Sequence, residues 1–203
     1  MPKVYAIDGI TPVVHPSAFV HPSAVLIGDV IVGPRAYIGP GASLRGDFGR
    51  IVVEAGANIQ DTCMLHGFPG KDTVVGAEST IGHGAVLHGC EIGRGALIGM
   101  NAVVNDNAVV GEDAIVAALA FVKAEERIAP RTLVAGIPAK TLRTLTEQEL
   151  RWKKDNMLLY QQLAVRSATT MREVEALTAV EPDRKRIDIP GSIPLSELKK
   201  RHG

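Results

Sequence analysis

Three histidines, His66, His83 and His88, are the residues of this chain whose types and spacing could do chemistry. Neutral imidazole is the commonest protein ligand of transition metals, and three such ligands plus a water make a catalytic zinc site. The cluster therefore predicts a metal site with one open coordination position. The remaining histidines lie outside this cluster: His15, His21 and His202.

The elements that must position these histidines are six-residue repeats. A small residue, usually alanine, follows the leading aliphatic residue of most repeats by four positions. A six-residue period fits neither a helix nor a hairpin meander, and it is typical of a parallel β-helix. The aliphatic positions, with one interruption and one slip of register, are Val14, Val20, Leu26, Val32, Ile38, Leu44, Val75, Ile81, Leu87, Ile92, Ile98, Val104, Val110, Val116 and Val122.

A β-helix of this kind is triangular, with three hexads and about eighteen residues in each coil. The aliphatic residue fills the interior, the small residue fits at a corner, and Gly, Asn or Asp tolerate the unusual φ/ψ values there. A β-sandwich with evenly spaced strands is the alternative, but it has no reason to keep a strict six-residue phase. Handedness does not follow from the repeat, since general chirality favours right-handed crossovers.

The spacing of His66 and His88 places one above the other. They are 22 residues apart, whereas a coil takes about eighteen. The segment 67–73 contains Pro69 and Gly70 and breaks the hexad phase, which indicates an inserted loop of roughly four residues. Without that loop the two histidines lie in adjacent coils, and parallel strands about 4.8 Å apart suit two ligands of one metal.

His83 falls elsewhere on the coil. It precedes His88 by five residues, which is up to roughly 16 Å of extended chain. It does not easily reach the same metal within one chain, whereas a three-fold neighbour can present its own His83. We expect a homotrimer with three metal sites at its interfaces, each built by two chains. The alternative treats the histidines as unrelated polar residues on an exposed face.

Composition indicates one compact domain whose main partner is neither nucleic acid nor a membrane. The 203 residues are 46% hydrophobic and carry a formal net charge of +0, so a sizeable core is expected and an anionic partner is not. We find no apolar run long enough to span a membrane and no signal peptide. Cys63 and Cys90 are therefore expected to be reduced thiols of a cytoplasmic protein, with Cys90 not a metal ligand.

A helix is expected after the repeats. Thr146 and Glu149 form a capping box, and an amphipathic helix from there to about Leu177 packs its apolar stripe on the β-helix. The stripe consists of Leu150, Leu158 or Leu159, and Leu163. The chain then divides into a β-helix that carries the metal site (1–140), a segment with the C-terminal helix (141–180), and a tail rich in proline and charge (181–203).

Polar residues gather along the chain just before His66, where the hexad pattern fails: Arg45, Asp47, Asn58, Gln60 and Asp61. A buried charge is costly unless it is matched. We therefore expect Arg45 and Asp47 to take part in an ion pair across the subunit interface, with a structural or a chemical role. Gln60 either hydrogen-bonds the metal-bound water or is a corner residue of the turn.

These motifs resemble the γ-class carbonic anhydrase family of hexapeptide-repeat proteins. The resemblance rests on residues 44–47, residues 58–61 and the three histidines with their neighbours, and it covers roughly residues 10–140. It implies a left-handed β-helix and zinc, or else iron or cobalt, bound by the three histidines between trimer subunits. It also implies an intersubunit salt bridge of Arg45 with Asp47, and Gln60 positioning the metal-bound water. The predicted fold class is mainly β, a left-handed parallel β-helix followed by a C-terminal α-helix.

Further segments look like the PaaY branch of phenylacetic acid degradation, whose architecture the CaiE branch of carnitine metabolism shares. The branch implies a thioesterase for ring-modified phenylacetyl-CoA derivatives. Residues 67–72 lack the proton-shuttling glutamate of the best-known γ-class carbonic anhydrase, so fast CO2 hydration is not expected. The segments that carry this resemblance are 10–14, 43–50, 152–154, 160–161 and 181–186.

The competing hydrolytic functions share one chemical step, attack by a metal-activated water. Zinc lowers the pKa of a bound water to roughly 7, and the hydroxide attacks CO2 or a thioester carbonyl. We predict a zinc-dependent thioesterase whose pocket is lined by Tyr160, a residue that could equally be only a packing tyrosine. The alternatives are a γ-class carbonic anhydrase, a hexapeptide acyltransferase with one histidine as general base, and a non-catalytic trimer that binds CoA thioesters.

Overall fold

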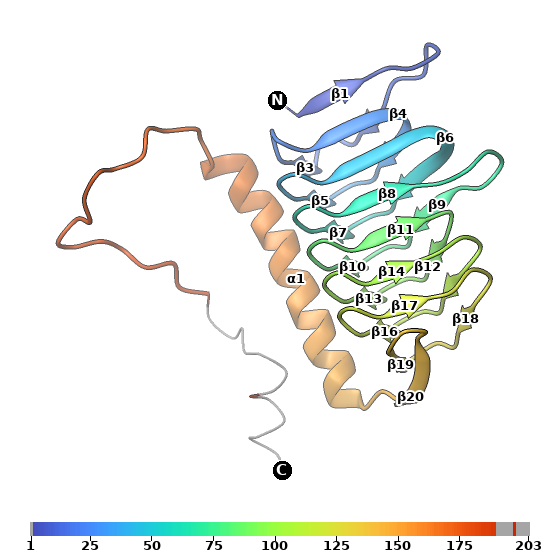
Figure 1. The fold of residues 1–203 in the computed structure, drawn as a ribbon. Helices are drawn as coiled ribbons and strands as arrows, with labels where there is room; N and C mark the ends of the chain where they lie inside the picture. The colour runs from blue at the N-terminus through green and yellow to red at the C-terminus, as the bar shows by residue number, and fades with distance from the viewer. Residues whose placement is uncertain (1, 190–196, 198–203) are drawn as a thin grey trace.

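Short strands stack in parallel to form a left-handed β-helix with one long helix at its side (Figure 1). The computed structural model describes residues 2–189 and Glu197. In regular coils the strand partners are eighteen residues apart, as Val103 and Phe121 are, which is the spacing that three hexads per coil require. The predicted fold class is confirmed. The β-sandwich is wrong, because successive coils pair in parallel.

Three stacks of strands make the faces of the coil. The first face comprises β3 (Phe19–Val20), β5 (Tyr37–Ile38), β7 (Asn58–Ile59), β10 (Thr80–Ile81), β13 (Leu97–Ile98), β16 (Ile115–Val116) and β19 (Thr132–Ala135). The second comprises β1 (Lys3–Tyr5), the first halves of β4 (Val25–Val32) and β6 (Ser43–Val53), β8 (Met64–His66), β11 (Val86–His88), β14 (Val103–Val104) and β17 (Phe121–Val122). The third comprises β2 (Val13–Val14), the second halves of β4 and β6, β9 (Thr73–Val75), β12 (Glu91–Ile92), β15 (Val109–Val110) and β18 (Arg127–Ile128).

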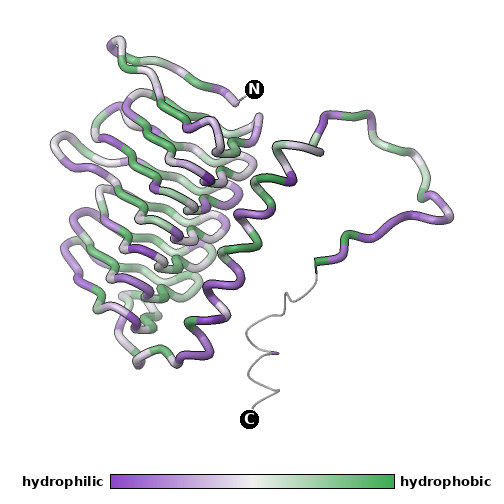
Figure 2. Tube along the Cα trace, turned by 180° about the vertical axis from the view of Figure 1, so that it is seen from behind, coloured by the Kyte–Doolittle hydropathy of each residue, from purple (hydrophilic) through white to green (hydrophobic). Residues whose placement is uncertain are grey.

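The aliphatic residues of the hexads fill the interior. Leu44, Leu65 and Leu87 form one such row on the second face, and each is 0% exposed. Figure 2 shows hydrophobic residues recurring along the successive coils. Burial of each leucine contributes about 2 kcal/mol of transfer free energy. Val14 and Val20 are only partly buried, because they belong to the first coils and have fewer neighbours.

Small residues occupy the corners, and the two cysteines are among them. Cys63 and Cys90 are free and buried in the core cluster. Burial raises the pKa of the Cys63 thiol to about 11 and that of Cys90 to about 12. Both remain neutral thiols at physiological pH, and the interior position of Cys90 agrees with its exclusion as a metal ligand.

The corner between the second and third faces is enlarged in two successive coils. Val25 pairs with a residue eighteen positions on, but Val30 pairs with Ile51, 21 positions on, so three residues are added there. One coil later, Met64 and Val86 are 22 residues apart. The inserted loop predicted after His66 is therefore confirmed. We call residues 47–50 the first enlarged corner and residues 67–72 the second.

The helix α1 (Glu147–Thr170) runs back along the first face and packs against β3, β5 and β7. It follows β20 (Lys140–Thr144), which pairs antiparallel with β19. The predicted capping box of Thr146 and Glu149 is present. Of the predicted apolar stripe, Leu150, Leu159 and Leu163 are partly buried, whereas Leu158 is 41% exposed. The buried face consists of Glu149, Lys153, Met157 and Ala164.

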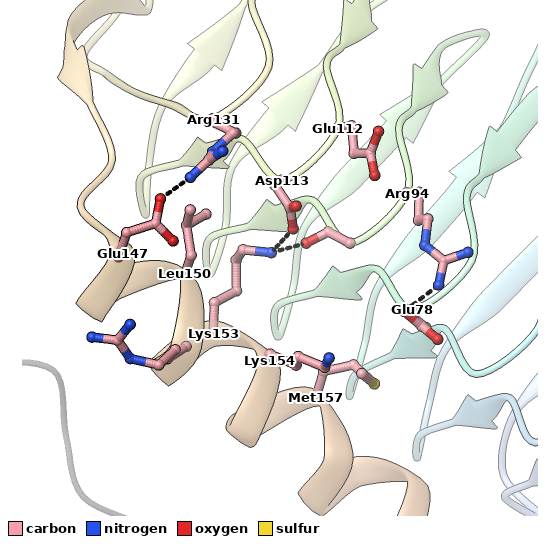
Figure 3. Close-up of a pocket in the computed structure, with 12 residues that line it drawn as sticks. Glu78, Arg94, Glu112, Asp113, Arg131, Glu147, Leu150, Lys153, Lys154 and Met157 are labelled. Atoms are coloured by element: carbon pink, nitrogen blue, oxygen red, sulfur yellow. Dashed lines mark hydrogen bonds and ion pairs between the residues drawn. The ribbon is translucent and has the colours of Figure 1, made fainter.

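Ion pairs attach α1 to the corner between the first and third faces (Figure 3). Lys153 is 4% exposed, and its Nζ lies 2.5 Å from Asp113 Oδ1 and also donates to the carbonyl oxygen of Gly95. Arg131 of the same corner pairs with Glu147 of the first helical turn. Ion pairs as well as apolar contacts therefore hold helix α1 against the β-helix.

Replacing Lys153 by Ala should loosen this attachment. The variant loses two charge-assisted hydrogen bonds in a buried position, and we expect a loss of about 1–2 kcal/mol of stability and a Tm lower by roughly 2–8 °C. Thermal unfolding followed by circular dichroism at one fixed protein concentration measures the shift. Lys154→Ala, one residue on and exposed, is the matched control, and equal Tm values for the two variants would contradict the docking role.

Helix α1 ends at Thr170, seven residues before the predicted end near Leu177. The side-chain hydroxyls of Thr169 and Thr170 donate back to carbonyl oxygens of the preceding helical turn. Beyond this point the chain leads away from the β-helix (Figure 1), so Leu177, at 65% exposure, has no surface on which to be buried. Most of the predicted tail after residue 189, including His202, lies outside the described residues. Among the described helices there is none long and apolar enough to cross a membrane.

Candidate metal centre

His66 and His88 end strands β8 and β11 and are partners in the parallel ladder. Their ring centroids are 5.1 Å apart, and His66 Nδ1 lies 3.2 Å from His88 Nε2. The rings meet at the enlarged side of the coil, just before the second enlarged corner. The vertical register predicted from the 22-residue spacing is confirmed, since the four extra residues are held in the loop.

The separation of the two facing nitrogens fits a shared tetrahedral metal. Two imidazole nitrogens at 2.0–2.1 Å from one zinc ion lie about 3.3 Å from each other, and the facing atoms of His66 and His88 are 3.2 Å apart. No rearrangement of the β-helix is needed to bring them together. The donor set of this corner therefore suits zinc, and iron or cobalt would accept the same imidazole ligands.

Each of these rings is held by a carboxylate on its other side. His66 Nε2 lies 3.0 Å from Asp47 Oδ1, and His88 Nδ1 is hydrogen-bonded to Asp106 Oδ1. A carboxylate only accepts, so these nitrogens carry the protons. The two facing nitrogens are also within hydrogen-bond distance of each other, and which of them donates depends on the tautomer. With both protons on the carboxylate side, the facing nitrogens would present lone pairs that a cation between them stabilises. Such carboxylate–histidine pairs usually orient metal-binding histidines.

Asp47 is ionised because of its partners. Burial opposes its charge, but hydrogen bonds from Arg45 and His66 outweigh that effect and hold the pKa of the Asp47 carboxyl below its usual value. Arg45 Nη1 lies 2.8 Å from Asp47 Oδ2 in the same chain. The two charges are therefore matched within one chain, and a pair across the subunit interface stays a prediction. Residues two apart on strand β6 point to one side, which brings them together.

His83 lies on a different corner, between the first and second faces, directly after β10. Its Nδ1 is 2.5 Å from Asp61 Oδ2, and its side chain is 45% exposed. Like the other two rings, it has one nitrogen held by a carboxylate, so its Nε2 is the nitrogen that can bind a metal. Within the described part of a single chain, no group of three or more His, Cys, Asp or Glu residues could hold a metal. The sharing of His83 between chains stays a prediction.

A buried amide chain supports the His83 corner. Gln60 and Asn58 are 5% and 0% exposed. The Gln60 side chain accepts from the backbone N–H of His83 at 3.3 Å and donates to Asn58 Oδ1 at 3.1 Å, and Asn58 donates to Thr80 Oγ1 at 2.9 Å. Gln60, Asn58 and Asp61 therefore belong with His83 and not with the His66–His88 pair of the same chain. The role of Gln60 toward a metal-bound water stays a prediction.

Tyr160 lies on α1 and packs against Tyr37 of β5, with 5.7 Å between the ring centroids. Burial, and then the nearby charge of Asp61, raise the pKa of Tyr160 to about 12. The phenol therefore keeps its proton at neutral pH and is unsuited to act as a base. It packs against the cluster of Phe19, Tyr37 and Ala164 and also lines a hollow on the helix with Leu159 and Leu163, so its role in a substrate pocket stays a prediction.

Sequence reasoning missed three residues of this centre. Asp106 follows His88 by eighteen residues, one coil, so counting along the repeat could have found it. Phe48 and Phe68 lie in the two enlarged corners, 5.5 Å and 6.3 Å from the rings of His66 and His88. Inserted residues have no hexad phase, so no signal in the sequence placed these aromatic rings.

The chain is similar to known proteins over nearly its whole length. Residues 11–46 and 89–124 match the family described as bacterial transferase hexapeptide (six repeats). The carnitine operon protein CaiE of Citrobacter koseri is 57% identical over 183 residues, which cover 90% of this chain and 93% of that protein. CaiE of Salmonella newport matches at the same identity, over 92% of its length.

Solved structures of hexapeptide proteins are also similar. A hexapeptide transferase family protein from Anaplasma phagocytophilum has a TM-score of 0.78 and 37% identity, over 80% of this chain and 96% of that one. A Bacillus cereus protein whose proposed activity is acetyl transfer has a TM-score of 0.79 and 32% identity, over 80% and 95%. These findings agree with the CaiE part of the resemblance noted above, and its γ-carbonic-anhydrase and PaaY parts stay predictions.

Proposed function

The chain belongs to the hexapeptide-repeat transferase family, with CaiE proteins among its relatives, and from this premise we propose that it is a metal-dependent acyl-CoA thioesterase. The observation that carries the proposal is the pair of facing nitrogens of His66 and His88, 3.2 Å apart, each ring backed by an aspartate. A transferase needs one histidine as a base, and such a base has no need of a second ring facing it at ligand distance.

The residues of the chain have distinct roles in this proposal. His66 Nδ1 and His88 Nε2 would hold the metal from one chain, and the Nε2 of His83 would complete the ligand set from a neighbouring chain. Asp47, Asp61 and Asp106 fix the proton on the opposite nitrogen of each ring. When bound, zinc supplies a water whose pKa is lowered to about 7. Arg45 keeps Asp47 ionised, and so keeps His66 in the metal-binding tautomer.

The proposed reaction is hydrolysis. A water oxygen adds to the thioester carbonyl carbon, the carbon–sulfur bond breaks, and the products are a carboxylic acid and the CoA thiol. We propose ring-modified phenylacetyl-CoA derivatives as substrates, in phenylacetate degradation. The carnitine operon name of the relatives makes CoA esters related to carnitine the second group to test.

Acyl transfer from CoA is the second candidate function. It is supported by the transferase family match and by the two similar structures. A histidine held by a carboxylate, such as His83 with Asp61, has the arrangement of a general base. CO2 hydration is a third activity for the same metal-activated water, although residues 67–72 contain no glutamate or histidine to export protons.

Purified protein should contain bound metal and should hydrolyse acyl-CoA without any acceptor. We expect turnover of phenylacetyl-CoA or carnitine-related esters in a thiol-release assay, lost on chelation and restored by zinc. CO2 hydration is measured on the same sample, and amine or alcohol acceptors are added in parallel. Metal-free protein that turns over acyl-CoA only with an acceptor would establish the transferase instead, and fast CO2 hydration without thiol release would establish a carbonic anhydrase.

A further inference from the structure

Two phenylalanine side chains flank the histidine pair. Phe48 comes from the first enlarged corner, and its ring is 5.5 Å from that of His66 with an interplanar angle of 46°. Phe68 comes from the second, and its ring is stacked beside His88 at 6.3 Å and 22°. These are two of the four phenylalanines in the chain. The two insertions in the repeat therefore place an aromatic ring next to each metal-binding imidazole.

The second enlarged corner is held firmly against the site. A Cβ atom on Gly49 would lie 2.9 Å from the carbonyl oxygen of Phe68, and one on Gly89 would lie 2.9 Å from the Phe68 ring. The buried hydroxyl of Thr73 donates to the His66 carbonyl at 2.6 Å and accepts from the Gly89 N–H at 2.9 Å. The lack of a side chain at Gly49 and Gly89 therefore allows the Phe68 backbone and ring to approach this corner closely, next to His88.

Within the single chain, little covers Phe48. Its exposed fraction is 61%, although its ring contacts His66. An apolar ring that stays in water beside a polar centre gains free energy when a flat apolar group covers it, since aromatic rings pair in offset or edge-to-face contacts. A two-carbon acyl group bound at the histidines has too little surface to make that contact.

We propose that Phe48 and Phe68 form the acyl-binding wall of the site and select thioesters with a planar, apolar acyl group over short ones. This inference rests on the proposed thioesterase function and adds its specificity-determining residues. The carbonyl carbon meets the water at the histidines, and the ring of the acyl group packs on the wall. The selectivity therefore comes from the two insertions, not from the repeats.

The test compares kcat/KM for phenylacetyl-CoA and acetyl-CoA in the zinc-loaded full chain. We expect the ratio of the two values to fall about tenfold or more in Phe48→Ala and in Phe68→Ala, mainly through KM for phenylacetyl-CoA. Phe68→Leu keeps apolar volume without the ring and should give an intermediate ratio. Tyr5→Ala removes an exposed aromatic ring of strand β1 (53% exposed), three strands from β8 in the same stack, and should leave the ratio unchanged.

The outcomes separate this inference from the proposed function. If the wild-type chain hydrolyses both esters and the ratio stays within about twofold in both alanine variants, the wall is overturned and the thioesterase stands. If the metal-loaded protein hydrolyses no acyl-CoA, the thioesterase fails. In that case, binding of phenylacetate and of acetate, measured by NMR titration of the same protein, tests whether the two phenylalanines bind an aromatic group. Weaker phenylacetate binding in the variants supports the wall, and unchanged binding overturns it. Metal content and Tm show whether each variant is folded. If Phe68→Ala does not fold, Phe48→Ala alone provides the test, because Phe48 is exposed.

Discussion

The His88→Ala variant should lose both its bound metal and its acyl-CoA hydrolysis while the β-helix remains folded. His88 supplies one of the two facing nitrogens, and its side chain is 34% exposed, so its removal opens no cavity in the core. Loss of a residue that hydrogen-bonds a metal ligand typically lowers metal affinity or activity about 10–100-fold, and we expect loss of a direct ligand to exceed about a hundredfold. Elemental analysis of the purified protein and the thiol-release assay measure the two losses.

His15→Ala is the matched control for this result. His15 is exposed in the first coils and hydrogen-bonds the nearby Ser17, so its loss removes an imidazole without touching the centre. We expect wild-type metal content and turnover from it, and circular dichroism should show both variants folded. Hydrolysis that persists in metal-free His88→Ala protein would rule out the metal mechanism, whatever else the chain does with CoA esters.

Subunits with His83→Ala and subunits with His88→Ala, each inactive alone, should recover activity when assembled together. A working site takes His66 and His88 from one chain and His83 from its neighbour. In a cyclic trimer that contains both variants, one of the three interfaces joins the two intact halves of the site, so about a third of the sites should work. Co-expression with two different affinity tags, followed by tandem purification, gives the mixed assemblies, and their metal content and turnover give the recovery.

Mixed His66→Ala and His88→Ala subunits provide the control. Both residues belong to one corner of one chain, so no mixture of these two variants assembles a complete site, and no recovery is expected. Mixed assemblies of verified composition that stay inactive in the first experiment would show that His83 is not shared between chains. It would then act with Asp61 on its own corner, as the transferase candidate requires.

Counting along the repeat was enough to predict the coil and part of the centre. The hexad phase gave the buried rows such as Leu44, Leu65 and Leu87, and it placed His66 under His88 once the inserted loop was removed. It also separated His83 from them. These predictions succeed because a β-helix repeats one local geometry, so that a residue number modulo about eighteen gives a position on the coil.

The same counting failed wherever the chain leaves the repeat. The three added residues of the first enlarged corner shift Asp47 out of phase, so its bond to His66 and its pairing with Arg45 inside one chain were not foreseen. The prediction for helix α1 was incomplete for a different reason. Its sequence suggested an apolar stripe, yet Lys153 and Glu149 are buried, because they meet Asp113 and Arg143 from other segments.

The sequence by itself determined the coil and the stacking of two of the three histidines, because both follow from a short-range period that every hexad repeats. Only the tertiary structure decided that Asp47 holds the His66 ring, that Phe48 and Phe68 stand beside the histidines, and which face of α1 is buried. Those features depend on contacts between an insertion or a helix and a coil many residues away, and no local period records such contacts.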